Sequence, residues 1–103
     1  MYGNDWLWTE LGTGDGTLRA TPGSDGLLQA KFPTYRLVDG SLTVSANRLD
    51  GTSNGVQVDV PGGYGATGFQ AVGVSFPAPG CWSITESISG HSLTFVVKVV
   101  AAP

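Results

Sequence analysis

The chain has 103 residues, of which 41% are hydrophobic and 13% are charged, and its formal net charge is −3. This length suits one domain with one core, and the apolar content excludes a disordered chain. Five scattered basic residues against eight acidic ones exclude a nucleic-acid-binding surface. We therefore predict a single folded domain spanning residues 1–103, with no nucleic acid among its partners.

Turn residues divide the sequence into short apolar segments that are typical of strands. No window of about a dozen residues carries a helical apolar stripe free of Gly and Pro. Asp-Gly pairs at residues 15–16, 25–26, 39–40 and 50–51 supply the positive φ angles that tight turns need. In chain order, we predict eight strands: residues 5–10, 17–20, 27–32, 41–48, 56–60, 69–76, 81–89 and 93–100.

The last two predicted strands alternate most clearly between apolar and polar residues, and a turn at residues 89–91 joins them. One face of each strand therefore belongs to the core. We predict buried side chains for Trp82, Ile84, Leu93, Phe95 and Val97. The segment before them, residues 76–80, contains two prolines that cannot continue a hydrogen-bonded ladder. We predict that this segment carries the chain from one sheet to the other.

Residues 76–85 read FPAPGCWSIT, and residues 92–99 read SLTFVVKV. This pattern resembles the closing hairpin of bacterial immunoglobulin-like domains, in which a Pro-Gly-x-aromatic start precedes two alternating strands. Together with GYGATGFQ at residues 63–70, the stretch from 62 to 100 resembles a group of uncharacterised bacterial secreted proteins and lipoproteins. The resemblance implies a fold class and an exported protein, but no activity.

We accordingly predict an all-β fold, an immunoglobulin-like two-sheet antiparallel sandwich of about seven or eight strands. Cys81 is the sole cysteine, which excludes the inter-sheet disulfide of antibody domains. No stretch reaches the roughly 18 apolar residues of a membrane span, and residues 1–5 lack the features of a signal peptide. The resemblance implies an extracytoplasmic protein, secreted or lipid-anchored at the cell surface, with its export segment absent from this sequence.

Cys81 and His91 are the candidate nucleophile and base. Hairpin pairing places Cys81 opposite Val97 or Lys98, roughly 20 Å from His91, which argues against their cooperation in catalysis. We predict a structural role for Cys81.

Four of the eight acidic residues lie in Asp-Gly turns, where the carboxylate caps its own backbone. Of the other four, Asp59 and Glu86 are the candidate carboxylates of a small hydrolase. Glu86 falls on the core-facing side of its strand. It therefore lies either beyond the edge of the core or inside it with a hydrogen-bonding partner.

Calcium is the metal ion to consider, because Asp15 lies in a Gly-rich turn and Asp50 shares a segment with Ser53 and Asn54. The spacing of known calcium loops is absent, and such sites need about six oxygen ligands. We predict no metal site and no cofactor.

The aromatic residues offer a candidate binding surface. Trp6 and Trp8 are two residues apart, so on a strand both rings share one face. If this face is buried, the rings belong to the core. If it is exposed, together with Tyr2, Tyr35 or Tyr64, it makes a platform for sugar rings or for another protein.

Three functions follow from these patterns. We predict a non-enzymatic extracytoplasmic module that binds a protein or a carbohydrate. The alternatives are a structural spacer domain of a larger surface protein and a small hydrolase that uses Asp or Glu residues. Val96, Val100 and Ala102 lie opposite the core residues of the last strand, which predicts a homodimer through the sheet containing residues 93–100.

Overall fold

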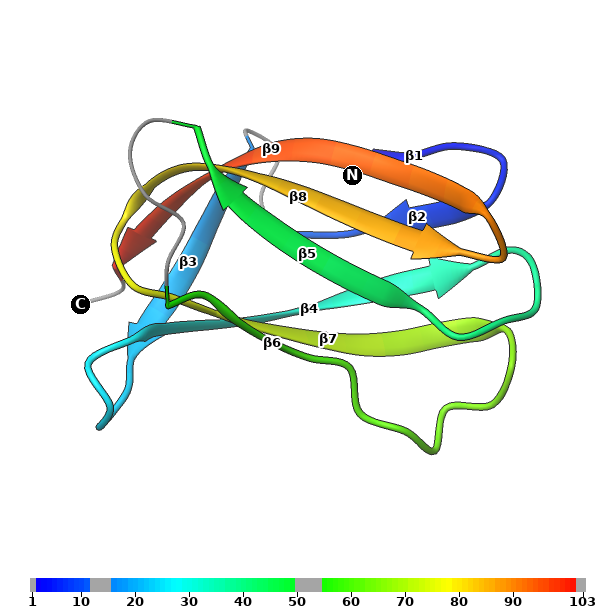
Figure 1. Cartoon of the computed structure of the whole chain (residues 1–103), viewed down its shortest axis with the longest axis horizontal. Helices are drawn as coiled ribbons and strands as arrows, with labels where there is room; N and C mark the ends of the chain where they lie inside the picture. The colour runs from blue at the N-terminus through cyan, green and yellow to red at the C-terminus, as the bar shows by residue number, and fades with distance from the viewer. Residues whose placement is uncertain (1, 12–15, 50–54, 102–103) are drawn as a thin grey trace.

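The computed structural model describes residues 2–11, 16–49 and 55–101, and no residue in these ranges is helical (Figure 1). The prediction of an all-β chain is confirmed. The strands are β1 (Tyr2–Gly3), β2 (Leu7–Thr9), β3 (Thr17–Pro22), β4 (Leu28–Arg36), β5 (Thr43–Arg48), β6 (Gln57–Asp59), β7 (Gly68–Phe76), β8 (Gly80–Ile88) and β9 (His91–Ala101). The eight predicted strands correspond to β2 to β9. The described ranges hold no helix with the length and hydrophobicity needed to cross a membrane.

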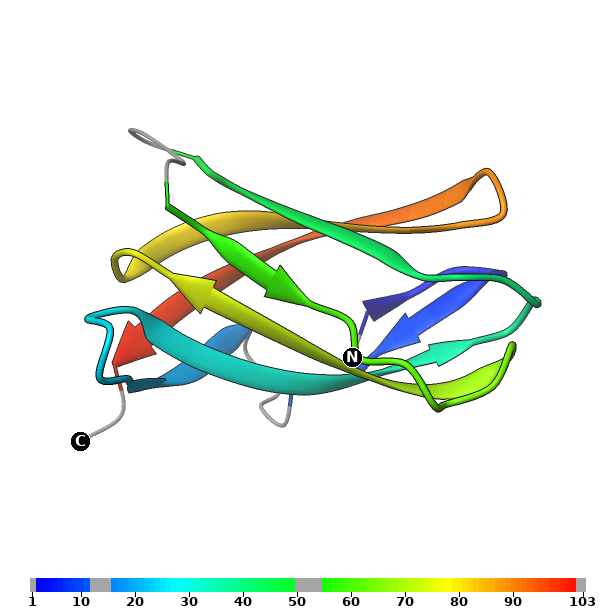
Figure 2. The ribbon, with the colours of Figure 1, turned by 60° about the horizontal axis from the view of Figure 1, so that its bottom comes forward.

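The strands lie in two layers that one strand joins (Figures 1 and 2). β4, β6 and β7 form one layer, and β5, β8 and β9 form the other. β3 belongs to both, because Thr21 and Pro22 pair antiparallel with β4 whereas its residues from Thr17 to Ala20 pair parallel with β9. The pairing therefore runs without a break through β1-β2-β4-β3-β9-β8-β5, and β7 and β6 branch from β4.

This arrangement differs from the predicted pair of separate antiparallel sheets, since the nine strands form one mixed sheet. The physical reason is edge protection. By changing partner along its length, β3 covers part of an edge of both β4 and β9 that would otherwise present unpaired backbone groups.

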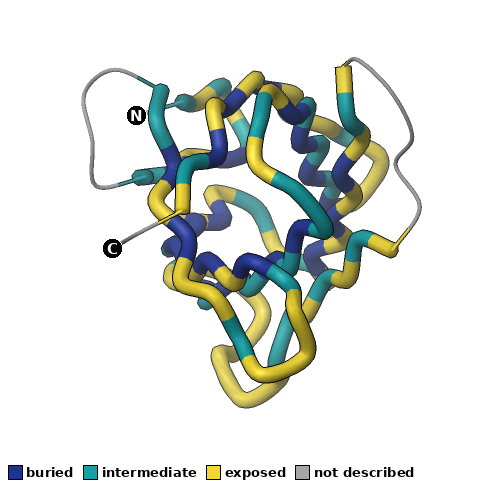
Figure 3. The backbone as a smooth tube through the Cα atoms, turned by 90° about the vertical axis from the view of Figure 1, so that its left-hand side faces the viewer, coloured by how far each residue is buried: buried dark blue, intermediate teal, exposed yellow. Residues whose placement is uncertain are grey.

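The core lies between the two layers, where buried positions alternate with exposed ones along each strand (Figure 3). All five predicted core residues are buried. The hairpin of β8 and β9 has the predicted turn: Ile88 pairs with His91, and Ser89 and Gly90 adopt φ angles of 49° and 83°. Positive φ at both central residues is the signature of a two-residue hairpin turn.

The proline-containing connector crosses between the layers as predicted, from the end of β7 to the start of β8 (Figure 2). Trp82 fixes this crossing from inside the core. Its indole Nε1 donates to the carbonyl oxygen of Ala78 at 3.2 Å, and its ring packs against Phe76 with centroids 5.2 Å apart.

Candidate functional site

Four exposed aromatic side chains meet on the outer face of the β4 layer. Trp8 of β2 pairs with Tyr35 of β4, and Tyr35 pairs with Phe69 of β7, so the three residues form a row across neighbouring strands. Tyr64, from the segment before β7, lies with its ring centroid 5.4 Å from that of Phe69. The exposed fractions are 42% for Trp8, 42% for Tyr35, 45% for Phe69 and 38% for Tyr64. We call these four residues the aromatic cluster.

Three of the four predicted ligand-binding residues belong to this cluster, and Trp6 does not. Trp6 precedes β2, is half-buried, and stacks on His91 with ring centroids 4.1 Å apart and planes 6° from parallel. It covers the turn end of the β8–β9 hairpin. The two tryptophans therefore do not form one platform, and Tyr35 and Phe69 extend the surface from Trp8 instead.

Sequence reasoning missed Phe69, although a signal for it was present. Val72, Val74 and Phe76 of the same strand have the spacing of one core-facing side, and all three are buried. Phe69 has the opposite parity, which places it on the outer face. A large aromatic residue in such a position is a candidate binding residue.

Arg36 holds the segment that carries Tyr64 and leads into Phe69. Its side chain is only 3% exposed. The guanidinium nitrogens are hydrogen-bonded to six backbone carbonyl oxygens at 2.8–3.3 Å, with one N–H shared between two of them: those of Gly40, Tyr64, Gly65, Thr67, Gly68 and Phe69. The hydroxyl of Thr67 in turn donates a hydrogen bond to the backbone carbonyl oxygen of Arg36 at 3.0 Å.

The sequence explains why this segment depends on the buried guanidinium group of Arg36. Four of the seven residues from 62 to 68 are glycines, so the segment has few side chains with which to pack. Its carbonyl groups converge on one cation instead, and the guanidinium presents five N–H donors in a rigid plane. Arg36 is therefore a positioning residue for the aromatic cluster, which sequence reasoning did not identify.

A shallow trough extends from the aromatic cluster along β7. The outward residues of β7 beyond Phe69 are small, namely Ala71, Gly73 and Ser75. Larger side chains flank Gly73 and Ser75 on both neighbouring strands, and Pro33 of β4 lies beside Ala71. The pairing register forms one row of Gln29, Ser75 and Gln57 and a second row of Lys31, Gly73 and Asp59.

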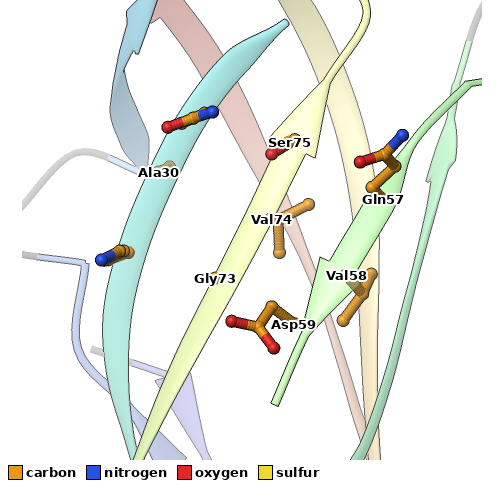
Figure 4. A pocket seen from close by; sticks show the side chains of 9 residues that line it. Ala30, Gln57, Val58, Asp59, Gly73, Val74 and Ser75 are labelled. Carbon is orange, nitrogen blue, oxygen red and sulfur yellow. The ribbon is translucent and has the colours of Figure 1, made fainter. Parts of the chain in front are cut away.

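Two hollows of about 250 Å³ each occupy this trough. The first lies between β4 and β6 over Gly73 and Ser75, with Gln57 and Asp59 at one side (Figure 4). The second is apolar and includes Pro33, Phe69 and Ala71, and both hollows share Lys31. Together with the aromatic cluster they make a continuous surface, which we call the outer groove.

Glu86 lies in the core between the layers, which answers the question left open by the sequence. Its side chain is 0% exposed, and its carboxyl group is hydrogen-bonded to the hydroxyl groups of Thr9 and of Thr34, the latter at 2.5 Å. The two threonine oxygens are themselves 3.0 Å apart. Burial raises the pKa of Glu86, and the hydrogen bonds from Thr34 and Thr9 oppose that shift.

The geometry around Glu86 also favours its neutral form. Three oxygen-to-oxygen contacts link the carboxyl group and the two hydroxyls. The hydroxyls supply two protons, and a neutral carboxyl supplies a third, so each contact then holds one proton. Asp59 lies on the outer face of β6, so the two candidate hydrolase carboxylates do not share a cleft.

The other predicted sites do not converge either. Cys81 is exposed and pairs with Lys98, while His91 pairs with Ile88 at the opposite end of the hairpin. The calcium candidates Asp15, Asp50, Ser53 and Asn54 lie outside the described residues. Among the described residues, no group of three His, Cys, Asp or Glu side chains is placed to hold a metal ion.

Val96 is 49% exposed on the outer face of β9. β9 pairs with β8 from His91 to Val99 on one edge, and with β3 only from Lys98 to Ala101 on the other. Homodimerisation through this face stays a prediction. In sedimentation at micromolar concentration we expect a dimer that Val96→Thr with Val100→Thr converts to a monomer, whereas a monomeric wild-type chain would refute the prediction.

Comparisons with known proteins identify the fold. Neither a scan against protein-family models nor a search of curated proteins finds a match. Among solved structures, the chain is similar to domains 4 and 5 of the S-layer protein SbsC, with a TM-score of 0.56 and 20% sequence identity. The alignment covers 92% of this chain and 54% of that chain, so this chain spans about half the length of that structure. At this identity the likeness is one of fold.

Proposed function

We propose that this chain is an immunoglobulin-like structural domain of a larger protein at the bacterial cell surface. The observation that carries the proposal is the fold likeness to an S-layer protein over 92% of the chain. The alternative predicted from the sequence, a spacer domain, thus has more support than the predicted binding module. A structural role also agrees with a chain whose candidate catalytic residues lie far apart.

The pairing of β3 with β9 suits a domain that carries tension between neighbouring parts of a longer chain. The two strands are parallel over four residue pairs, from Thr17 with Lys98 to Ala20 with Ala101. The backbone N–H of Lys98 adds a hydrogen bond to the carbonyl oxygen of Gly16 at 2.9 Å. Once β1 and β2, which precede β3, have detached, tension from both ends of the chain pulls the two parallel strands in opposite directions along their axes, so their hydrogen bonds are loaded together.

The experiment is single-molecule extension of a chain that contains several copies of this domain in series. We expect each copy to extend in one abrupt step. The rate of forced unfolding is set by the energy barrier to unfolding, and here that barrier is the simultaneous breaking of the β3–β9 contacts. Gradual extension at low force, with no separate step for each copy, would contradict a structural role that carries tension.

A second candidate function is ligand binding on the outer face of the β4 layer. The specific observation in its favour is the aromatic cluster, in which four large rings remain about 40% exposed next to a groove. Contiguous exposed apolar surface is a common mark of a binding site. This function is compatible with the structural one, because the outer groove and the β3–β9 contact involve different residues.

A further inference from the structure

We propose that the outer groove binds a neutral, extended polysaccharide. The proposal rests on the second candidate function and names its ligand class. It does not depend on the structural role.

The shape of the groove fits a chain molecule. Its floor is the outward side of β7, from Ser75 to Phe69, which is about 20 Å long at the rise of a strand. Gly73, at the middle of the floor, has no side chain. Ser75 is the next residue on the same face of β7, and Gln29 and Gln57 lie on either side of it. The floor is therefore long, narrow and open at its surface, as an extended ligand of several rings requires.

The polar lining fits a ligand rich in hydroxyl groups. The amides of Gln29 and Gln57 each donate and accept hydrogen bonds, as does the hydroxyl of Ser75. Lys31 and Asp59 carry opposite charges on the two sides of Gly73, so the lining has no net charge. A neutral sugar presents donors and acceptors along its whole length, which matches this mixture.

The aromatic cluster supplies the apolar part of the site. A sugar ring has a face of C–H groups and a rim of hydroxyls, and tryptophan and tyrosine combine an apolar ring with a polar tip. Trp8 and Tyr35 lie directly opposite each other on neighbouring strands, with Phe69 next in the row. The rings thus close one end of the groove with exposed apolar surface for the terminal sugars.

Other extended ligands fit less well. A peptide that binds by adding a strand needs a free strand edge, and along the part of the floor from Gly73 to Ser75 both edges of β7 already pair, with β4 and with β6. A nucleic acid needs several cations on one face, whereas Lys31 is opposed by Asp59. A compact protein docking on the aromatic cluster is the remaining competitor, and the experiment distinguishes it.

The test is affinity electrophoresis of the full chain through gels that contain one soluble neutral polysaccharide each: a β-glucan, a xylan, a mannan or starch. A sulfated dextran serves as the charged comparison. We expect at least one neutral polysaccharide to retard the wild-type chain. Gly73→Val should weaken that retardation at least about tenfold, and Trp8→Ala combined with Tyr35→Ala should do the same.

Gly73→Val is a sharp probe because it blocks the groove without disturbing the strand. A Cβ at position 73 would meet its nearest atom, the Cβ of Asp59, at 3.7 Å, which is an ordinary contact, and valine favours strands. Ser83→Val on β8 is the matched control. It places the same side chain on the outer face of the other layer and should leave the retardation unchanged. Thermal unfolding confirms that each variant is folded.

Retardation that survives Gly73→Val, or retardation confined to the sulfated dextran, would overturn the proposal. Absence of retardation in every neutral gel would overturn it as well. If the proposal fails, the indole NMR signal of Trp8 recorded at increasing concentrations of the chain shows whether ligand binding on this face fails as well. A signal that shifts with concentration would indicate that the aromatic cluster binds a protein and not a polysaccharide. A signal that does not shift would contradict the second candidate function as well.

Discussion

Glu86→Gln is expected to abolish a loss of stability that the wild-type chain undergoes as the pH rises from acidic to neutral. The ordinary pKa of a glutamic acid is 4.5, and burial raises the pKa of Glu86 in the folded chain. Between these two values the folded chain keeps a proton that the unfolded chain has released. The free energy of unfolding therefore falls as the pH rises from about 4.5 through the raised pKa, and it is highest on the acidic side.

Glutamine replaces the neutral carboxyl with a group of nearly the same shape. Its amide keeps one acceptor and one donor for the hydroxyls of Thr9 and Thr34, and it cannot ionise. We expect Glu86→Gln to be more stable than the wild-type chain at neutral pH and to lack this pH dependence. Glu86→Ala is the contrasting variant. It leaves two buried hydroxyls and a cavity, which should cost about 2–5 kcal/mol.

Urea denaturation of the three proteins between about pH 4 and pH 8 provides the measurement. If the curves of the wild-type chain and of Glu86→Gln run parallel over this range, Glu86 is ionised in the folded state. The assignment of a neutral carboxyl would then be wrong.

Arg36→Lys is expected to destabilise the fold by about 1–3 kcal/mol, and Arg36→Ala by more. Lysine presents three donors from a single nitrogen, so it cannot reach the six carbonyl oxygens that the planar guanidinium contacts. The glycine-rich segment at residues 62–68 should lose its fixed path. Hydrogen exchange of its backbone amides should accelerate more than that of the β8–β9 hairpin.

Arg19→Lys is the matched control for this substitution. Arg19 is exposed on β3, so its replacement should change the free energy of unfolding by less than about 0.5 kcal/mol. If Arg36→Lys behaves like Arg19→Lys in both stability and hydrogen exchange, the buried guanidinium does not organise the segment that carries Tyr64.

The local alternation of residues predicts much of this fold, because it depends on neighbours in the sequence. The β8–β9 hairpin has the predicted turn and core side, and Cys81 pairs with Lys98, one of the two predicted positions. The partner change of β3 was not predictable in this way. It is decided by strands far along the chain, since Thr21 pairs with Gln29 while Thr17 pairs with Lys98.

The tryptophans show how one local contact alters a periodic pattern. The predicted strand 5–10 would place Trp6 and Trp8 together, but β2 begins at Leu7. The side-chain oxygen of Asn4 accepts hydrogen bonds from the backbone N–H groups of Trp6 and Leu7, both at 2.9 Å. This capping turn fixes the path of the chain before the strand begins, and Trp6 packs on His91.

The candidate site was predictable in its residue types but not in its organisation. Trp8, Tyr35 and Tyr64 stand out as aromatic residues in a chain with little charge. The position of Arg36 at a strand end gives no sign of its buried contacts with carbonyl groups about 30 residues away in the sequence. Glu86 likewise depends on Thr9 and Thr34, which are 77 and 52 residues away.

The most direct test of the proposed structural role compares extension of one domain along two directions. Handles at the chain ends load β3 and β9 in opposite directions. In the second protein, one handle is attached at Asp25→Cys, just after β3, and the other at the carboxyl end, and both proteins carry Cys81→Ser. This attachment pulls β3 and β9 from the same end, so their hydrogen bonds break one after another. We predict a clearly higher unfolding force for the first attachment, and equal forces in the two directions would contradict a domain built to carry tension.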